Sequence, residues 1–202
     1  MRTKRGSTEG VKKHTFEIHD PTLISQEKLV VLGLVAVKHS LTNIHNGGKD
    51  LPIGALAVSK GRVIGKGLPR DVTESNPNLH AAYIALFDAN RLQEHTPVDT
   101  IVISIEPSWM TLQSLTESGD LKRVFYVSPR STLVEAGLVR PLDVTAEEMN
   151  DIMGCPLKQI SRIEDAALSF LNEAVFSCVV RDLESGVVVP NYERFIEIAP
   201  IL

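Results

Sequence analysis

Cysteine is scarce in this sequence, and no apolar stretch is long enough to span a membrane. The two cysteines, Cys155 and Cys178, lie far apart and form no C-x-x-C pair, so we expect two reduced core thiols instead of a disulfide framework. The longest apolar run, Leu29–Val37, is too short to cross a bilayer. The polar first residues have no apolar segment of a signal peptide behind them. These absences predict a cytoplasmic protein that contacts no membrane.

Neither sign of charge dominates the chain. The formal net charge is −4, which argues against an extensive nucleic-acid-binding surface. Basic residues do cluster near the N-terminus, at Arg2, Lys4, Arg5, Lys12 and Lys13. We interpret residues 1–22 as a flexible, solvated tail, and binding of phosphate or nucleic acid by this tail is the lesser alternative.

Size and composition are those of an ordinary globular chain. The sequence has 202 residues, of which 43% are hydrophobic and 23% are charged. A domain of about 150 residues buries roughly 70% of the surface of its unfolded chain, so neither a disulfide nor a metal is needed to build the core. We expect one domain over residues 23–202, with a helical extension from about residue 140.

Hydrophobic periodicity predicts the order of the elements. Ser25 caps a largely buried helix that runs to about Ile44, and Gly47 and Gly48 end it because they tolerate left-handed backbone. The next elements are a hairpin with strands at 53–58 and 62–67, a helix at 79–90, a strand at 100–107, a helix at 108–119 and a strand at 121–129. A hairpin followed by β–α alternation predicts an α/β fold with a mixed central sheet and helices on both faces.

The C-terminal third is patterned less clearly. Thr145 and Glu148 have the spacing of a capping box at the start of a short helix. Residues 187–190 and 195–202 are expected to be extended or docking segments. An amphipathic helix is predicted over residues 161–180, with an apolar stripe made of Ile163, Ala167, Phe170, Leu171, Ala174 and Cys178.

Four segments together resemble the cytidine and tRNA-adenosine deaminase superfamily. They are IGALAV-SKG-RVIGKG, NPNLHAAYIAL, VDTIVISIEPSWMT and GDLKRVFYVSPR, and their order and spacing match across residues 52–130. The resemblance implies a cytidine deaminase-like three-layer α/β/α sandwich. In that superfamily His-Ala-Glu opens one helix and Pro-Cys-x-x-Cys opens another. The His and both Cys bind zinc, and the Glu transfers protons.

This sequence departs from the superfamily at the positions that carry the chemistry. His80 is kept, but Ala82 stands where the Glu belongs, and Ser108 and Thr111 stand where the two Cys belong. A methyl group cannot move a proton, and neutral hydroxyls are weak zinc ligands beside thiolates. We therefore expect no zinc, no other metal and no catalytic residue. Natural degeneration explains these changes more simply than one engineered substitution does.

Three further residues are expected around the same degenerate pocket. Pro69 replaces an Asn that often contacts ribose in related enzymes, Glu106 is retained although it is not a ligand, and Trp109 stands at the rim. Trp109 has two interpretations, stacking on a base or packing at a helix start. His80 is expected to be a hydrogen-bonded core residue at a helix start.

The leading interpretation is a catalytically inactive deaminase-like protein, a pseudoenzyme that serves as a binding, scaffold or oligomer subunit. Some tRNA-editing deaminases pair a catalytic subunit with a degenerate one. By resemblance, the partner is a second copy of this chain or an active nucleoside or nucleic-acid deaminase. The helix at 161–180 is the best candidate partner surface, and simple coverage of the sheet by this helix is an equal alternative.

Other functions stay open. One is an atypical or zinc-independent nucleoside or base deaminase, and another is a nucleobase or nucleotide sensor that keeps the pocket without turnover. A hydrolytic pair of Ser108 and His80 lacks an orienting acid and an oxyanion motif. A relocated metal site would have to use Cys155, Cys178 and scattered histidines, whose spacing matches no zinc finger. The G-x-G of residues 65–67 has no third glycine and fails as a dinucleotide fingerprint.

Overall fold

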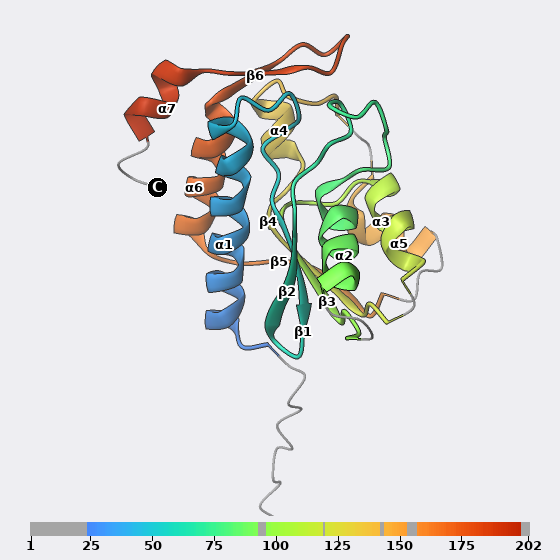
Figure 1. The fold of residues 1–202 in the computed structure, drawn as a ribbon. Coiled ribbons are helices and arrows are strands. Elements are labelled where there is room, and N and C mark those ends of the chain that lie inside the picture. The colour runs from blue at the N-terminus through green and yellow to red at the C-terminus, as the bar shows by residue number, and fades with distance from the viewer. Residues whose placement is uncertain (1–23, 93–95, 119, 142–143, 153–156, 199–202) are drawn as a thin grey trace, which may run out of the picture.

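The fold is built on a five-stranded mixed sheet (Figure 1). The computed structural model describes residues 24–92, 96–118, 120–141, 144–152 and 157–198. The strands of the sheet are β1 (Ala55–Ser59), β2 (Arg62–Gly67), β3 (Thr100–Ile105), β4 (Arg123–Ser128) and β5 (Gln159–Arg162). Their order is β2-β1-β3-β4-β5. β1 is antiparallel to β2 and β3, whereas β3, β4 and β5 run parallel. The predicted mixed sheet is confirmed.

Helices cover both faces of this sheet (Figure 1). On one face lie α1 (Gln26–His45) and α6 (Ala166–Ser177), and on the other lie α2 (Ala81–Leu92), α3 (Trp109–Thr116) and α5 (Ala146–Ile152). The remaining elements are α4 (Ser131–Glu135), a small sheet of β6 (Val179–Arg181) and β7 (Val188–Pro190), and α7 (Tyr192–Ile198). The architecture is the predicted three-layer α/β/α sandwich.

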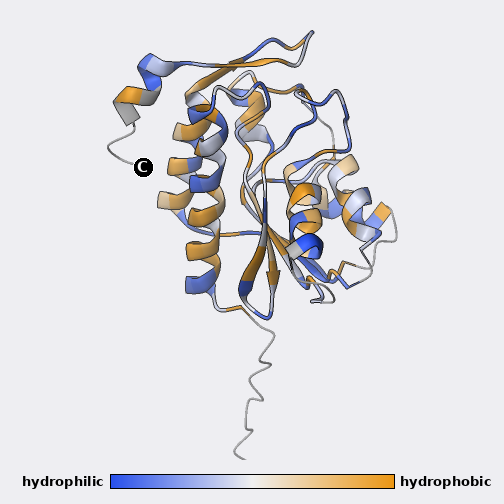
Figure 2. Cartoon of the chain, viewed as in Figure 1, coloured by the Kyte–Doolittle hydropathy of each residue, from blue (hydrophilic) through white to orange (hydrophobic). Residues whose placement is uncertain are grey.

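Two clusters of buried apolar side chains hold the layers together, one on each face of the sheet. β3 and β4 are buried along their whole length, which explains their almost unbroken apolar composition. Because neighbouring strand residues point to opposite faces, Val102 packs with α1 and α6, while Ile101 and Ile103 pack with α2 and α3. In Figure 2 the loop of residues 68–78, which lies outside these clusters, is largely hydrophilic.

Local signals set both ends of α1. The Ser25 hydroxyl accepts a hydrogen bond from the Lys28 backbone N–H (3.3 Å), which confirms the predicted N-cap. At the other end, Gly47 has a φ of 64° and its N–H donates to the Ile44 carbonyl. Left-handed backbone at this position is what terminates a helix.

The glycines of β2 let α2 lie directly on the sheet. A Cβ atom at Gly67 would overlap the Ala81 carbonyl oxygen, and one at Gly65 would overlap the Ala85 carbonyl oxygen. Any larger side chain would have to push the helix away from the strand. The G-x-G of this strand therefore serves helix packing, and it fixes the N-terminus of α2, together with His80, against the sheet.

The structure corrects the predicted helix over residues 161–180. α6 begins only at Ala166, because Asp165 caps it and accepts the Leu168 N–H on its carboxylate (2.8 Å). Residues 159–162 form β5, which extends the parallel sheet beside β4. This strand is short and only partly buried, so it carries no alternation that a sequence pattern could reveal.

The apolar stripe predicted on this helix is confirmed only in part: Ile163 and Cys178 are buried and Ala174 packs against the core, but two of its residues face outward. Phe170 is 60% exposed, and Ala167 is exposed as well. The buried side of α6 consists of Leu168, Ser169, Asn172, Val175 and Phe176. Asn172 lies there because its amide donates to the Ser104 carbonyl (2.5 Å) and to the Ser128 hydroxyl (2.9 Å). A polar residue held in the core by donating hydrogen bonds is not detected by hydropathy.

The start of α5 follows its predicted capping box. The Thr145 N–H and hydroxyl donate to the Glu148 carboxylate (2.8 and 3.0 Å), and the Glu148 N–H donates to the Thr145 hydroxyl (3.2 Å). Near the C-terminus, residues 188–190 are extended as predicted, but residues 192–198 form α7. The basic tail, Cys155 and residues 199–202 lie outside the described residues. Within the described ranges, no helix is both long and apolar enough to cross a membrane.

Candidate ligand pocket

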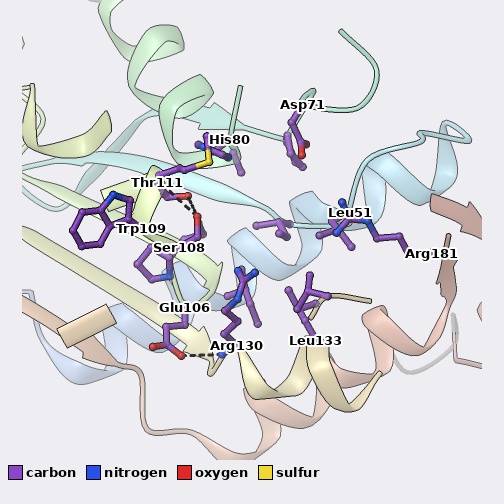
Figure 3. Close-up of a pocket in the computed structure, with 18 residues that line it drawn as sticks. Leu51, Asp71, His80, Glu106, Ser108, Trp109, Thr111, Arg130, Leu133 and Arg181 are labelled. Atoms are coloured by element: carbon purple, nitrogen blue, oxygen red, sulfur yellow. Dashed lines mark hydrogen bonds between the residues drawn. The ribbon is translucent and has the colours of Figure 1, made fainter. Parts of the chain in front are cut away.

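A pocket of about 370 Å³ lies at the carboxyl ends of the neighbouring parallel strands β3 and β4 (Figure 3). Open α/β sheets place their ligands outside the carboxyl ends of the strands. Most of the residues singled out from the sequence line this pocket, namely Pro69, His80, Glu106, Ser108, Trp109 and Thr111. The fold thus brings together residues from the 68–78 loop, the start of α2, the end of β3 and the start of α3.

The first turn of α3 supplies two hydroxyl groups. Ser108 is the N-cap of α3, and its Oγ accepts a hydrogen bond from the Thr111 backbone N–H (3.4 Å). The two hydroxyls are also hydrogen-bonded to each other, with 3.1 Å between Ser108 Oγ and Thr111 Oγ1 (Figure 3). Helix capping is sufficient to explain a serine at this position.

His80 stands directly before α2 and brings an unsatisfied nitrogen to the pocket. Its Nε2 is buried without a hydrogen-bond partner, so the hydrogen bond expected of a core histidine is absent at this atom. Burial lowers the pKa of His80 below its ordinary value of 6.5. The ring is therefore neutral at pH 7, and Nε2 can accept or donate one hydrogen bond to a ligand.

Ala82 is not part of the pocket wall. Its side chain is 0% exposed and belongs to the apolar cluster between α2 and the sheet, whereas the preceding Ala81 lines the pocket. A carboxylate in place of the Ala82 methyl group would enter an apolar cluster, where an ionised group is costly without a partner. The local packing matches the alanine that is present.

Glu106 follows β3 and connects two other loops through its carboxylate. One oxygen accepts the Arg130 N–H (2.9 Å), and the other accepts the Ala146 N–H (2.8 Å). These bonds join the end of β3 to the residues after β4 and to the start of α5. Because both oxygens are hydrogen-bonded to the backbone, Glu106 has a structural role in the pocket.

Three charged residues of the pocket have no counterpart among the predicted site residues: Asp71, Arg130 and Arg181. Arg130 directly follows the predicted strand at 121–129, and Glu106 lies near the end of the predicted strand at 100–107. Because ligands bind at the carboxyl ends of such strands, this position is a signal from which the sequence could have identified Arg130. Arg181 lies in β6 and Asp71 in the 68–78 loop, and neither belongs to a motif.

The donor set of this pocket does not fit a catalytic zinc ion. Zinc deaminases hold the metal with a His nitrogen and two thiolate sulfurs. Here a single imidazole shares the pocket with two neutral hydroxyls that are hydrogen-bonded to each other. Within the described residues no group of three or more His, Cys, Asp or Glu side chains could hold a metal ion. Cys178 is buried elsewhere, and burial raises the pKa of its thiol.

A serine hydrolase pair is not formed in the pocket either. A nucleophilic serine needs a base within hydrogen-bond reach of its hydroxyl. The Ser108 hydroxyl is bonded to Thr111, and His80 Nε2 has no hydrogen-bond partner. Burial, capping and packing account for these side chains without hydrolytic chemistry.

Comparisons with known proteins identify the fold. No protein-family model and no curated protein sequence matches this chain. Among solved structures, the chain is similar to the guanine deaminase from Nitrosomonas europaea, with 19% identity and a TM-score of 0.56 over 74% of this chain and 85% of that chain. It is also similar to a mutant protein solved in complex with 8-azaguanine, with 17% identity and a TM-score of 0.58 over 74% and 85% of the two chains. A guanine deaminase from Bacillus subtilis has 25% identity over 56% of this chain and 71% of that chain, with a TM-score of 0.47.

These similarities and the topology define the class of the protein. The chain has the cytidine deaminase-like fold that the sequence predicts. At identities of 17% and 19% the similarity shows the fold alone. What the pocket does has to follow from its own residues.

Proposed function

We propose that this chain is a deaminase-fold protein that has lost deamination and binds a small molecule in the remodelled pocket. The observation that carries this proposal is the hydrogen bond of 3.1 Å between Ser108 and Thr111. By the resemblance, these residues occupy the positions of the two thiolates, and here they satisfy each other at the first turn of α3. The proposal thus includes the loss of the resident zinc.

Catalysis by this superfamily depends on groups that the pocket does not offer. A zinc-bound water must be ionised, and a carboxylate must carry its proton to the base and the leaving ammonia. Ala82 is packed in the core, and both oxygens of Glu106 accept backbone hydrogen bonds. No proton carrier remains at the expected position.

Binding, in contrast, is supported by the preserved cavity. Its volume of about 370 Å³ lies within the range of roughly 300–1,000 Å³ that is typical of small-molecule sites. The wall is mainly apolar, and His80 Nε2 offers an unpaired hydrogen-bonding atom. A structurally similar protein was solved in complex with 8-azaguanine, so we propose a ligand with a heterocyclic base.

Two measurements test the proposal directly. Zinc content is determined on full-length protein purified without chelator, and ammonia release is assayed with free bases, nucleosides and nucleotides. We expect substoichiometric zinc and no ammonia. The same compounds are then screened by thermal shift, where a ligand at 100 times its dissociation constant adds about 2.7 kcal/mol of stability. One zinc per chain with ammonia release would establish the alternative, an atypical deaminase.

A partner-binding role is a second proposal, supported by exposed apolar side chains on α2 and α3. Tyr83 and Phe87 project from α2, and Trp109 and Met110 from α3; Phe87 is 60% exposed. We call these four residues the α2–α3 surface. Exposed apolar side chains gathered on neighbouring helices are typical of interaction sites. Phe87→Glu is expected to reduce the molecular mass measured by light scattering if the chain self-associates there, and an unchanged monomeric mass for wild type would contradict self-association.

A further inference from the structure

The pocket holds two guanidinium groups that the loss of catalysis does not explain. Arg130 comes from the end of β4 and Arg181 from β6 (Figure 3). Burial is the largest cause that lowers the pKa of Arg130. The negative charge of Glu106 raises this pKa, and the positive charge of Arg181 lowers it. Two like charges in a half-buried site repel each other unless an anion lies between them.

Arg130 has no partner for its buried nitrogen. Its Nε lies in the protein without a hydrogen-bond acceptor. The ion pairs found among the described residues are formed by other arginines, namely Arg70, Arg91 and Arg123. The backbone of Arg130 is fixed by its hydrogen bond to Glu106 (2.9 Å). Its side chain therefore projects from an anchored point with an N–H group that an entering oxyanion would satisfy.

Arg181 is oriented by neutral acceptors. Its Nε donates to the Gly186 carbonyl (3.0 Å), and one terminal nitrogen donates to the Leu138 carbonyl (3.1 Å). These bonds hold the guanidinium at the pocket without neutralising its charge. A guanidinium has five N–H donors, so others remain for a ligand.

The carboxylates Glu106 and Asp71 of the pocket offset part of the positive charge, and the negative charge of Glu106 raises the pKa of Arg130. Glu106 directs both oxygens to backbone N–H groups. Asp71 is close enough to Arg181 to feel its charge, but burial and the neighbouring Asp50 raise the pKa of Asp71. A raised pKa favours the neutral form of that carboxyl group. The pocket therefore combines two permanent cations with one carboxylate that is directed at backbone N–H groups and one whose pKa is raised.

We infer that the pocket binds a phosphate monoester, with its phosphate group between Arg130 and Arg181. A phosphate monoester carries a charge of about −1.5 to −2 at pH 7, which two guanidinium groups match. A single carboxylate would leave one of the arginines uncompensated. The forked donors of arginine fit phosphate oxygens, and the apolar wall and Trp109, across the pocket from Arg181 (Figure 3), can contact the organic part of the ligand. This inference rests on the proposed binding function and specifies its ligand class.

The test is a calorimetric titration of the full chain with phenyl phosphate, adenosine monophosphate and adenosine. Adenosine differs from its monophosphate only in the phosphate, so this comparison isolates the anion. We expect both monoesters to bind at least about tenfold more tightly than adenosine, and Arg130→Gln or Arg181→Gln to weaken their binding by at least about tenfold. Arg62→Gln is the matched control, because Arg62 is exposed on β2 outside the pocket, and it should leave binding unchanged.

The stability of Arg130→Gln separates ligand binding from a structural role. The substitution removes a buried donor that has no acceptor, so the melting temperature of the ligand-free protein should not fall, while the shift caused by phenyl phosphate should disappear. A lower melting temperature with unchanged affinity for phenyl phosphate would make Arg130 a structural residue and overturn the inference.

The outcomes distinguish the two proposals. If adenosine binds as tightly as its monophosphate in wild type and in both arginine variants, the phosphate site is wrong and the binding pocket stands. If none of the three compounds binds, the phosphate site is wrong, and the thermal-shift screen of bases, nucleosides and nucleotides decides whether the binding function stands. Release of ammonia from adenosine monophosphate would refute the loss of catalysis, yet tenfold weakening by the arginine variants would still support the phosphate site.

Discussion

Individual pocket residues differ in how fully their polar atoms are bonded, and this difference separates structural from ligand-facing side chains. Ser108 and Thr111 bond to each other, and Glu106 bonds to two backbone N–H groups. His80 Nε2 and Arg130 Nε are buried without partners. Because buried polar atoms are almost always paired in folded proteins, these two are the atoms that a ligand has reason to contact.

His80 makes a prediction about pH. Burial holds its pKa below 6.5 in the folded protein, so the unfolded chain takes up the proton first as the pH falls. The stabilising contribution of the neutral ring is fully present above a pH of about 6.5 and is lost as the pH falls toward the lower folded pKa. In urea denaturation at about pH 7.5 and about pH 5.5, His80→Gln should lose less stability on acidification than wild type. His45→Gln, exposed on α1, is the control, and an equal loss in His80→Gln and wild type would contradict the assignment.

Single elements show where local sequence signals are sufficient. The Ser25 cap, the Gly47 stop and the Thr145–Glu148 capping box all act within a few residues, and the structure contains all three. The helical pattern misplaces the start of α6 because a competing signal, Asp165, lies inside the predicted helix. The chain before Asp165 gains more by joining β4 than by extending the helix, since the strand N–H and carbonyl groups then pair with the sheet.

The cap of α6 gives an element-scale prediction. The Asp165 carboxylate accepts the Leu168 N–H (2.8 Å). Asp165→Ala should therefore lower the free energy of unfolding by about 1 kcal/mol, within the range of roughly 0.5–2 kcal/mol for loss of an N-cap. Chemical denaturation measures this change. Glu164→Ala removes an exposed neighbouring carboxylate, and a cost as large as that of Asp165→Ala would show that charge, not capping, is responsible.

For the whole molecule, the pocket depends on segments that meet only in the folded sheet. The 68–78 loop, α2, α3, the residues after β4 and β6 all contribute to it. The close approach of α2 to β2 at Gly65 and Gly67 positions His80, and Glu106 connects the ends of β3 and β4 to α5. A ligand in this pocket would contact both sides of the sandwich at once.

Restoring the superfamily ligands is a whole-molecule prediction. Ser108→Cys together with Thr111→Cys would join His80 at the pocket, so we expect this double variant to bind about one zinc per chain and to melt at a higher temperature with zinc. Adding Ala82→Glu should restore little deamination, because Pro69 and the arginines also alter the substrate contacts. It should also lower stability, since Ala82 is buried. Metal analysis and ammonia release measure both effects, and rapid deamination by the triple variant would show that the pocket is otherwise intact.

From the sequence, only the residues of the candidate site that lie in the four segments resembling the superfamily can be predicted. The spacing of His80, Ser108 and Thr111 relative to the expected helix starts places them at one site, and all three line one pocket. Analogy assigns Ala82 to the same pocket, yet its side chain packs in the core. Arg181 lies beyond the segments that resemble the superfamily, so no spacing points to it.

The amino-acid sequence is enough to predict the order of strands and helices up to residue 130, the mixed sheet, and the absence of thiols at the two positions that the resemblance assigns to zinc ligands, because periodicity, caps and residue type act locally along the chain. The register of α6, the presence of β5 and the cationic character of the pocket depend on the folded arrangement. Burial, the pairing of polar atoms and the proximity of two charges involve residues far apart in sequence, and these relations exist only after the layers have packed.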